Sequence, residues 1–111
     1  MFVHARDEHR QITIHATWVE EVPADRRPAV MELITRINVE LAVSWFELDL
    51  DHGSVSARSG LDFEGIRPTD DALVENAFYA AERTLDRFLP ALTAVALEGL
   101  DVADIPDAPE D

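Results

Sequence analysis

The stretch that decides the fold is SWFELDLDHGSVSARSGLDF, residues 44–63. On both sides of its central DHG, apolar and polar side chains alternate with the period of two residues that half-buried strands show. Gly53 can adopt a positive φ, and Asp51 can bond the backbone of its own turn. The stretch therefore predicts a β-hairpin whose connection is a loop of residues 51–54.

The register of this hairpin follows from the faces of its two strands. A loop of two or four residues keeps the apolar side chains of both strands together, whereas a three-residue loop mixes the faces. The four-residue loop sets Leu50 opposite Val55 and Glu47 opposite Arg58. We therefore expect one apolar face for a core and one polar face that contains the Glu47 and Arg58 side chains.

A second pair of strands is expected before the hairpin. Residues 11–18, QITIHATW, alternate in the same way, and residues 2–5 can form their partner strand with residues 6–10 as the turn. Between the two pairs, residues 25–41 carry apolar side chains at helical spacing on one face. Asp25 suits the N-cap of this helix, and Pro28 suits its first turn.

A second amphipathic helix is expected after the hairpin. Thr69 and the two acidic residues that follow it suit the N-cap and the first turn, where the helix dipole favours negative charge. An apolar stripe then continues over residues 73–95. Pro90 lies within this stripe and predicts a kink or break near Arg87, and Gly99 predicts a left-handed C-cap.

The expected order of elements is β-β-α-β-β-α. It predicts an α+β fold of two layers, with helices on one face of an antiparallel sheet. A length of 111 residues suits a single domain, which we assign to residues 1–100. Residues 101–111 contain five acidic side chains and no basic one, so we expect a solvated, disordered acidic tail.

The composition disfavours several classes of function. There are 23 Asp and Glu against 9 Arg and no Lys, and the net charge of −14 argues against nucleic acid and anionic membranes as partners. The absence of cysteine removes disulfides and zinc–thiolate sites and fits a reducing compartment. The chain has no apolar run long enough to cross a bilayer and no recognisable secretion signal, so we expect a cytoplasmic protein.

Two longer stretches resemble the bacterial YbjN family. They are RRPAVMELITRINVELAVSWFELDLDHGSVSARSGLDFEG and ENAFYAAERTLDRFLPALTAVALEGL, with their FELDL strand, D-x-G turn, interrupted long helix and closing glycine. The resemblance implies a sensory transduction regulator with the fold of type III secretion chaperones, small acidic dimers that hold partner polypeptides. It implies no catalytic residues.

The chain departs from that architecture at its start. The secretion-chaperone fold opens with a helix and a strand before the elements found here, so the expectation is either a shortened protein or an edge supplied by another chain. An exposed sheet edge invites pairing, and we therefore expect a homodimer.

Three acidic side chains alternate along the first hairpin strand and its turn. Glu47, Asp49 and Asp51 could gather a hard cation such as Mg²⁺ or Ca²⁺, but the alternative is a solvated strand face balanced by Arg58. His4 and His15 could become cross-strand neighbours, although two histidines without a third ligand define no metal site. We therefore predict no metal, no cofactor and no catalytic residue.

Aromatic side chains are the remaining candidates for function. Trp18, Trp45, Phe46 and Phe78 could bind a partner, with packing in the core as the alternative role. We interpret the chain as a non-enzymatic, chaperone-like or regulatory module that binds a protein or peptide. One alternative is a sensory domain that binds a small ligand between sheet and helices, and a more remote one is a metal-dependent enzyme that uses the acidic strand face.

Overall fold

The computed structural model describes residues 2–6, 11–62 and 72–106. Its strands are β1 (Phe2–Arg6), β2 (Gln11–Glu21), β3 (Ser44–Leu48) and β4 (Ser54–Asp62). Its helices are α1 (Arg27–Asn38) and α2 (Ala72–Ala96), with short 3₁₀ helices η2 (Ala24–Arg26) and η3 (Val102–Asp104). The strands and α-helices follow one another in the predicted order.

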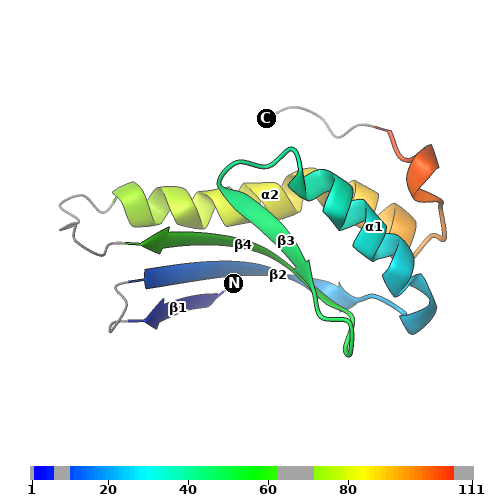
Figure 1. The fold of residues 1–111 in the computed structure, drawn as a ribbon, viewed down its shortest axis with the longest axis horizontal. Helices are drawn as coiled ribbons and strands as arrows, with labels where there is room; N and C mark the ends of the chain where they lie inside the picture. The colour runs from blue at the N-terminus through cyan, green and yellow to red at the C-terminus, as the bar shows by residue number, and fades with distance from the viewer. Residues whose placement is uncertain (1, 7–10, 63–71, 107–111) are drawn as a thin grey trace.

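The strands form an antiparallel sheet in the order β1-β2-β4-β3. Figure 1 shows α2 running along the sheet and α1 lying near its β3 end. The side chains between the layers are apolar, with Ile14 from β2, Val55 and Ala57 from β4, and Val30 and Leu92 from the helices fully or almost fully buried. The predicted two-layer α+β fold is confirmed.

The predicted hairpin exists, but its register differs by two residues. Leu48, not Leu50, pairs with Val55, and the connection consists of residues 49–53. The reason is the carboxylate of Asp49, which accepts hydrogen bonds from the backbone N–H groups of residues 51 and 52 and starts the turn two residues early. The predicted bond from the Asp51 side chain is therefore wrong, whereas the predicted positive φ of Gly53, +83°, is confirmed.

A shift of two residues leaves every side chain on its predicted face. Glu47 pairs with Ser56 and Trp45 pairs with Arg58, so the predicted pairing of Glu47 with Arg58 is wrong. The two side chains still meet diagonally, with Arg58 Nη1 2.8 Å from Glu47 Oε1.

Helix α1 is shorter than predicted at both ends. It begins at Arg27, and the 3₁₀ turn η2 precedes it, so Asp25 is not its N-cap; Pro28 lies in the first turn as predicted. The helix ends at Asn38 because the side-chain amide of that residue is bonded to the backbone of Phe46.

Helix α2 continues through Pro90, so of the predicted kink or break near Arg87 the break is wrong, while the kink stays a prediction. Buried Phe88 and Leu92 hold the helix against the core on both sides of the proline. The predicted C-cap is confirmed: Gly99 has φ +74°, and the N–H of the next residue donates to the carbonyl of Ala94. The predicted N-cap at residues 69–71 lies outside the described residues.

The first part of the acidic tail is packed, not solvated. Val102, the first residue of η3, and Ile105, directly after η3, contact the core cluster. Arg26 anchors the approach to this segment, because its guanidinium donates to the carbonyl oxygens of Val95 at 2.8 Å and Leu100 at 2.7 Å. A solvated tail therefore does not begin at residue 101, while the domain boundary at residue 100 stays a prediction.

Candidate protein-interaction surface

One face of the sheet carries none of the described helices. We call it the open face, and its members alternate with the core residues along each strand. The open face consists of Thr13, His15 and Thr17 of β2, Ser56, Arg58 and Gly60 of β4, and Trp45 and Glu47 of β3. None of these residues is fully buried, so a partner could reach them.

Trp45 is the largest side chain on the open face. A Cβ atom added at Gly60 would lie 3.8 Å from Cη2 of the indole, so the ring covers the space that this glycine leaves empty. The Arg58 guanidinium carbon lies 5.7 Å from the ring centroid, within reach of a cation–π interaction. Even so, 38% of Trp45 remains exposed.

Glu47 links Trp45 to Arg58. Its Oε1 accepts a hydrogen bond of 2.8 Å from Arg58 Nη1 and one of 3.3 Å from Trp45 Nε1. Burial of Glu47 opposes ionisation, but these bonds and the charges of Arg58 and His15 outweigh it and lower the pKa of the carboxyl below its ordinary value of 4.5. Glu47 is therefore ionised at neutral pH and holds both neighbours in place.

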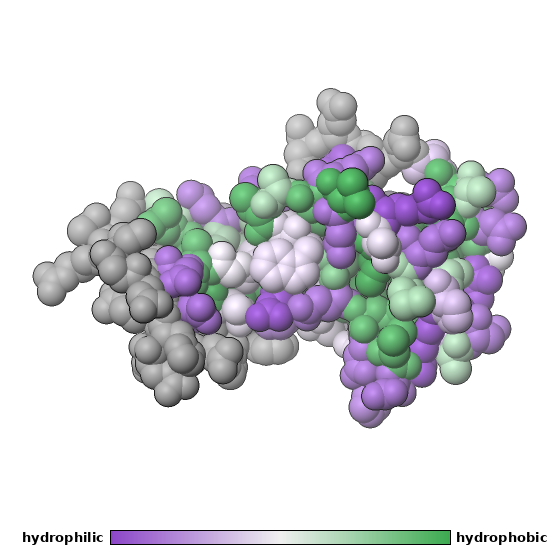
Figure 2. Space-filling model, in the orientation of Figure 1, coloured by the Kyte–Doolittle hydropathy of each residue, from purple (hydrophilic) through white to green (hydrophobic). Residues whose placement is uncertain are grey.

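We name Trp45, Glu47, Arg58 and Gly60 the Trp45 cluster. Its neighbours on the open face are polar, including Thr17 and Ser56, whose hydroxyl oxygens lie 2.9 Å apart. In the orientation of Figure 2, hydrophobic residues form several small groups separated by hydrophilic ones. The Trp45 cluster thus offers a single fixed aromatic anchor within polar surroundings, which is the composition of an interaction hot spot.

The four aromatic residues predicted to bind a partner have different environments. Trp18 is 8% exposed and Phe46 is 3% exposed, so both belong to the core, and the Phe46 ring meets Phe88 edge to face. Phe78 is half-buried against the core and contacts Tyr79. Of the four predicted residues, Trp45 alone is exposed, at 38%.

The sequence did not indicate Arg58 and Gly60 as parts of a site. Gly60 lies inside β4, which continues to Asp62. The sequence signal for this site was a glycine inside a strand, two residues from an arginine and next to a strand that contains a tryptophan.

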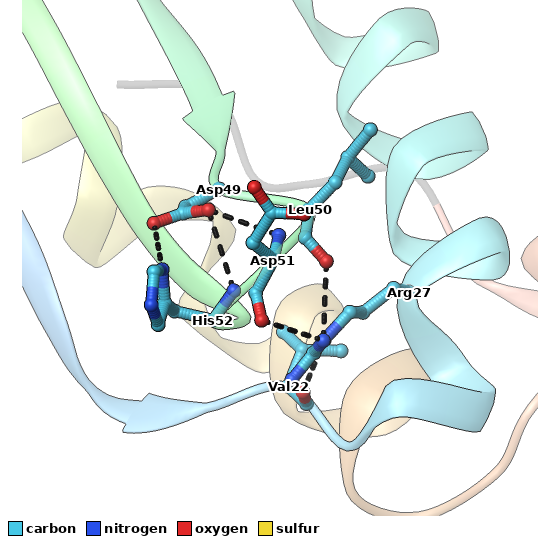
Figure 3. Close-up of polar contacts among 6 residues, drawn as sticks. All are labelled: Val22, Arg27, Asp49, Leu50, Asp51 and His52. Carbon is cyan, nitrogen blue, oxygen red and sulfur yellow. Dashed lines mark hydrogen bonds and ion pairs between the residues drawn. The ribbon is translucent and has the colours of Figure 1, made fainter.

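The acidic residues of the hairpin serve separate purposes (Figure 3). Asp49 Oδ2 lies 2.8 Å from His52 Nδ1, and the bond to this histidine, together with the turn N–H groups, lowers the pKa of Asp49. The backbone carbonyls of Leu50 and Asp51 accept hydrogen bonds from Arg27, which joins the turn to the start of α1. Glu47 of β3 forms an ion pair with Arg58 of β4.

The structure does not bring together the acidic and histidine side chains considered from the sequence as metal ligands. Within the described part of the chain, no three acidic or histidine side chains are placed to hold a metal ion. The register pairs His4 with Thr13 and His15 with Phe2, so the two histidines are not directly opposite each other.

Two shallow hollows lie between the helices and the segments beside them. A cleft of about 140 Å³ separates α1, α2 and the segment after Leu100, and it is lined by Leu33, Arg36, Ile37, Glu40, Phe88, Ala91, Val102, Ile105 and Pro106. A second hollow of about 200 Å³ lies where the connection between α1 and β3 meets Arg83 and Arg87 of α2. Both are smaller than the roughly 300–1,000 Å³ of typical ligand pockets. The second reaches the sheet only at Ser44, the first residue of β3.

Comparison with known proteins identifies the family. Neither a curated protein nor a solved structure gives a significant match to the chain. In the residues that the structure describes, no helix has the length and apolar character needed to cross a membrane. The model of the YbjN family, described as a "putative bacterial sensory transduction regulator", matches residues 1–94, and the chain therefore belongs to the YbjN family.

Proposed function

We propose that this chain is a non-enzymatic, regulatory or chaperone-like module that binds a protein or peptide partner through the Trp45 cluster. The observation that carries the proposal is the accessible indole of Trp45, held over Gly60 by its contacts with Arg58 and Glu47. A preorganised aromatic side chain loses little conformational entropy on binding, so its burial contributes to affinity. Membership of a family of regulators supports a binding role.

The charge of the chain indicates the chemistry of the partner. A net charge of −14 attracts basic segments over a distance and repels acidic ones. We therefore expect a partner with an apolar or cationic side chain for the Trp45 ring, surrounded by basic residues. The proposal also includes a homodimer and a cytoplasmic location. The homodimer is supported by the β1 edge of the sheet, beside which the described residues place no further strand, and the location by the cysteine-free composition.

The test compares Trp45→Ala with Leu50→Ala in quantitative pull-downs from a bacterial lysate. Leu50 is the matched control because it is also exposed, at 56%, but lies in the hairpin turn away from the open face. We expect a protein retained in stoichiometric amounts by the wild type and L50A, with at least a tenfold loss on W45A. Equal retention by all three chains would remove the Trp45 cluster from the proposal.

A sensory domain that binds a small ligand is the second candidate function. The observation in its favour is the cleft between α1, α2 and the segment after Leu100, which offers apolar side chains together with Arg36 and Glu40. A thermal-shift screen of small metabolites would support it if Ile37→Trp, which fills the cleft, abolishes the shift. A shift that survives this substitution would argue against the cleft as the binding site.

A further inference from the structure

The two edges of the sheet differ in their backbone hydrogen bonding. At the β3 edge, the Asn38 side chain accepts a bond of 2.8 Å from the Phe46 N–H and donates one of 3.1 Å to the Phe46 carbonyl. The Asn38 amide thus makes the two bonds that a neighbouring strand would make. Because the central residue of β3 is already satisfied, this edge is closed to another strand.

The same two bonds fix the direction in which the backbone groups of β1 point. Along a strand, the N–H and C=O groups of successive residues point to opposite sides. The N–H and C=O groups of Phe46 point away from β4. When this alternation is followed through the paired residues of β4 and β2 to β1, the N–H and C=O groups of residues 2, 4 and 6 point toward β2. The N–H and C=O groups of Val3 and Ala5 therefore point outward from the β1 edge.

The charge near this edge favours a second copy of the chain. The molecule carries 23 carboxylate side chains, and two copies repel each other over most of their surface. Strand β1, FVHAR, contains no acidic residue and one arginine, whereas Asp7 and Glu8 follow it in the sequence and Glu20 and Glu21 end β2. Strand β1 itself is thus the part of this edge along which two acidic molecules can approach with little repulsion.

We propose that two copies pair through their β1 strands, antiparallel and centred on His4, to form one continuous sheet. This register overlaps residues 2–6 completely and sets Val3 of each chain against Ala5 of the other, where both residues present outward N–H and C=O groups. The inference rests on the homodimer that the proposed function includes, and it adds where and in which register the chains meet. It is independent of the partner that binds the Trp45 cluster.

The closed β3 edge explains why such pairing stops at two chains. A β1–β1 interface uses the same surface on both copies, and the outer strand of each copy is then β3. With Asn38 on both outer edges, the sheet does not grow further.

The first test uses the absence of native cysteine. In the proposed register, the His4 residues of the two chains lie opposite each other in a non-hydrogen-bonded pair. Their Cα atoms are then about 4.5 Å apart, a separation that a disulfide accommodates. His4→Cys should form a covalent dimer under mild oxidation. Thr13→Cys is the control. The two Thr13 positions lie on the β2 strands of the two chains, three strand spacings or about 14 Å apart, which is too far for a disulfide.

The second test removes an outward donor. Ala5→Pro deletes one such N–H group from each chain and should weaken the dimer by about 10- to 100-fold, since each lost bond contributes roughly 0.5–1.5 kcal/mol. Ala5→Val keeps the N–H group and should leave the dissociation constant within about threefold of the wild type. Sedimentation measures the dissociation constants, and circular dichroism verifies that each variant folds.

Clear outcomes overturn the proposal. Each of three results would do so: the wild type is a monomer at 100 μM, H4C and T13C cross-link equally, or a folded A5P variant dimerises as tightly as A5V. If A5P does not fold, the cross-linking result decides. If W45A still dimerises but no longer retains a protein from the lysate, the result concerns the proposed partner site alone. The two proposals can therefore fail separately.

Discussion

Ser44 of β3 and Thr84 of α2 share a buried hydrogen bond, with 2.6 Å between their hydroxyl oxygens. The two residues are 5% and 7% exposed, so neither hydroxyl has ready access to water. This bond joins the edge strand to the long helix across a mostly apolar layer, in which the hydroxyl of buried Ser59 also donates to the Ala77 carbonyl of α2.

We expect Thr84→Val to lower the free energy of unfolding by about 1–3 kcal/mol, because it leaves the Ser44 hydroxyl buried without a partner. The double variant S44A/T84V should recover most of that loss, since both polar groups are then removed. Urea denaturation of the wild type, both single variants and the double variant measures the coupling. Additive losses would show that the two hydroxyls do not depend on each other.

The lowered pKa of Glu47 predicts a pH dependence of stability. A carboxyl with a lower pKa in the folded state stabilises the fold above its unfolded value, near 4.5, and this stabilisation is lost as the pH falls through the folded-state pKa. Glu47→Gln should therefore be less stable than the wild type by about 1 kcal/mol at pH 7, with the difference shrinking below pH 4.5.

Denaturant titrations from pH 7 to pH 3 test this dependence. Glu32→Gln is the control, because the ion pair of Glu32 with Arg36, at 3.6 Å, is exposed and lies within one helix. A stability difference between wild type and E47Q that stays constant down to pH 3 would contradict the role assigned to the Arg58 contact.

Gly53 and Gly99 both have positive φ, but their surroundings differ. A Cβ atom at Gly53 would lie less than 3.0 Å from the carbonyl oxygen of Val22, whereas at Gly99 it would meet no atom within 4 Å. We expect Gly99→Ala to cost about 1–2 kcal/mol from backbone strain alone and Gly53→Ala to cost clearly more. Thermal denaturation of both variants compares the costs, and equal values would mean that the turn moves away from Val22.

The packed segment after Leu100 should contribute to stability. Replacing both Val102 and Ile105 by Ser removes two half-buried apolar side chains, and we expect a loss of about 1–3 kcal/mol. Ala103→Ser, at an exposed position between them, should change stability by less than about 0.5 kcal/mol. An unchanged melting temperature for the double variant would show that this segment does not stabilise the domain in solution.

Local sequence patterns predicted the strands and helices better than their ends. The alternation in residues 44–63 gave the correct faces, because a register error of two residues preserves them. The exact register depended on which of two aspartates starts the turn, and Asp49 prevails because His52 and two backbone N–H groups bind it together. Such competition between equivalent side chains is decided by three-dimensional geometry.

Long-range contacts decided the other differences. Asn38 ends α1 by binding a strand eight residues later, and Pro90 is tolerated because the helix around it is packed against the core. The Trp45 cluster was only partly predictable: its tryptophan was a candidate, but its contacts with Arg58 and Gly60 join two strands. The difference between Trp18 and Trp45 also depended on which face of the sheet each occupies.

That difference gives the protein two separate optical reporters. Trp18 lies in the core at 8% exposure, whereas 38% of Trp45 is exposed on the open face, and these are the two tryptophans of the chain. A quencher such as acrylamide should reach the emission of Trp45 while sparing that of Trp18. In a Trp45→Phe variant, fluorescence follows unfolding of the core, and in a Trp18→Phe variant it follows events at the surface, so folding and binding can be observed independently in one small chain.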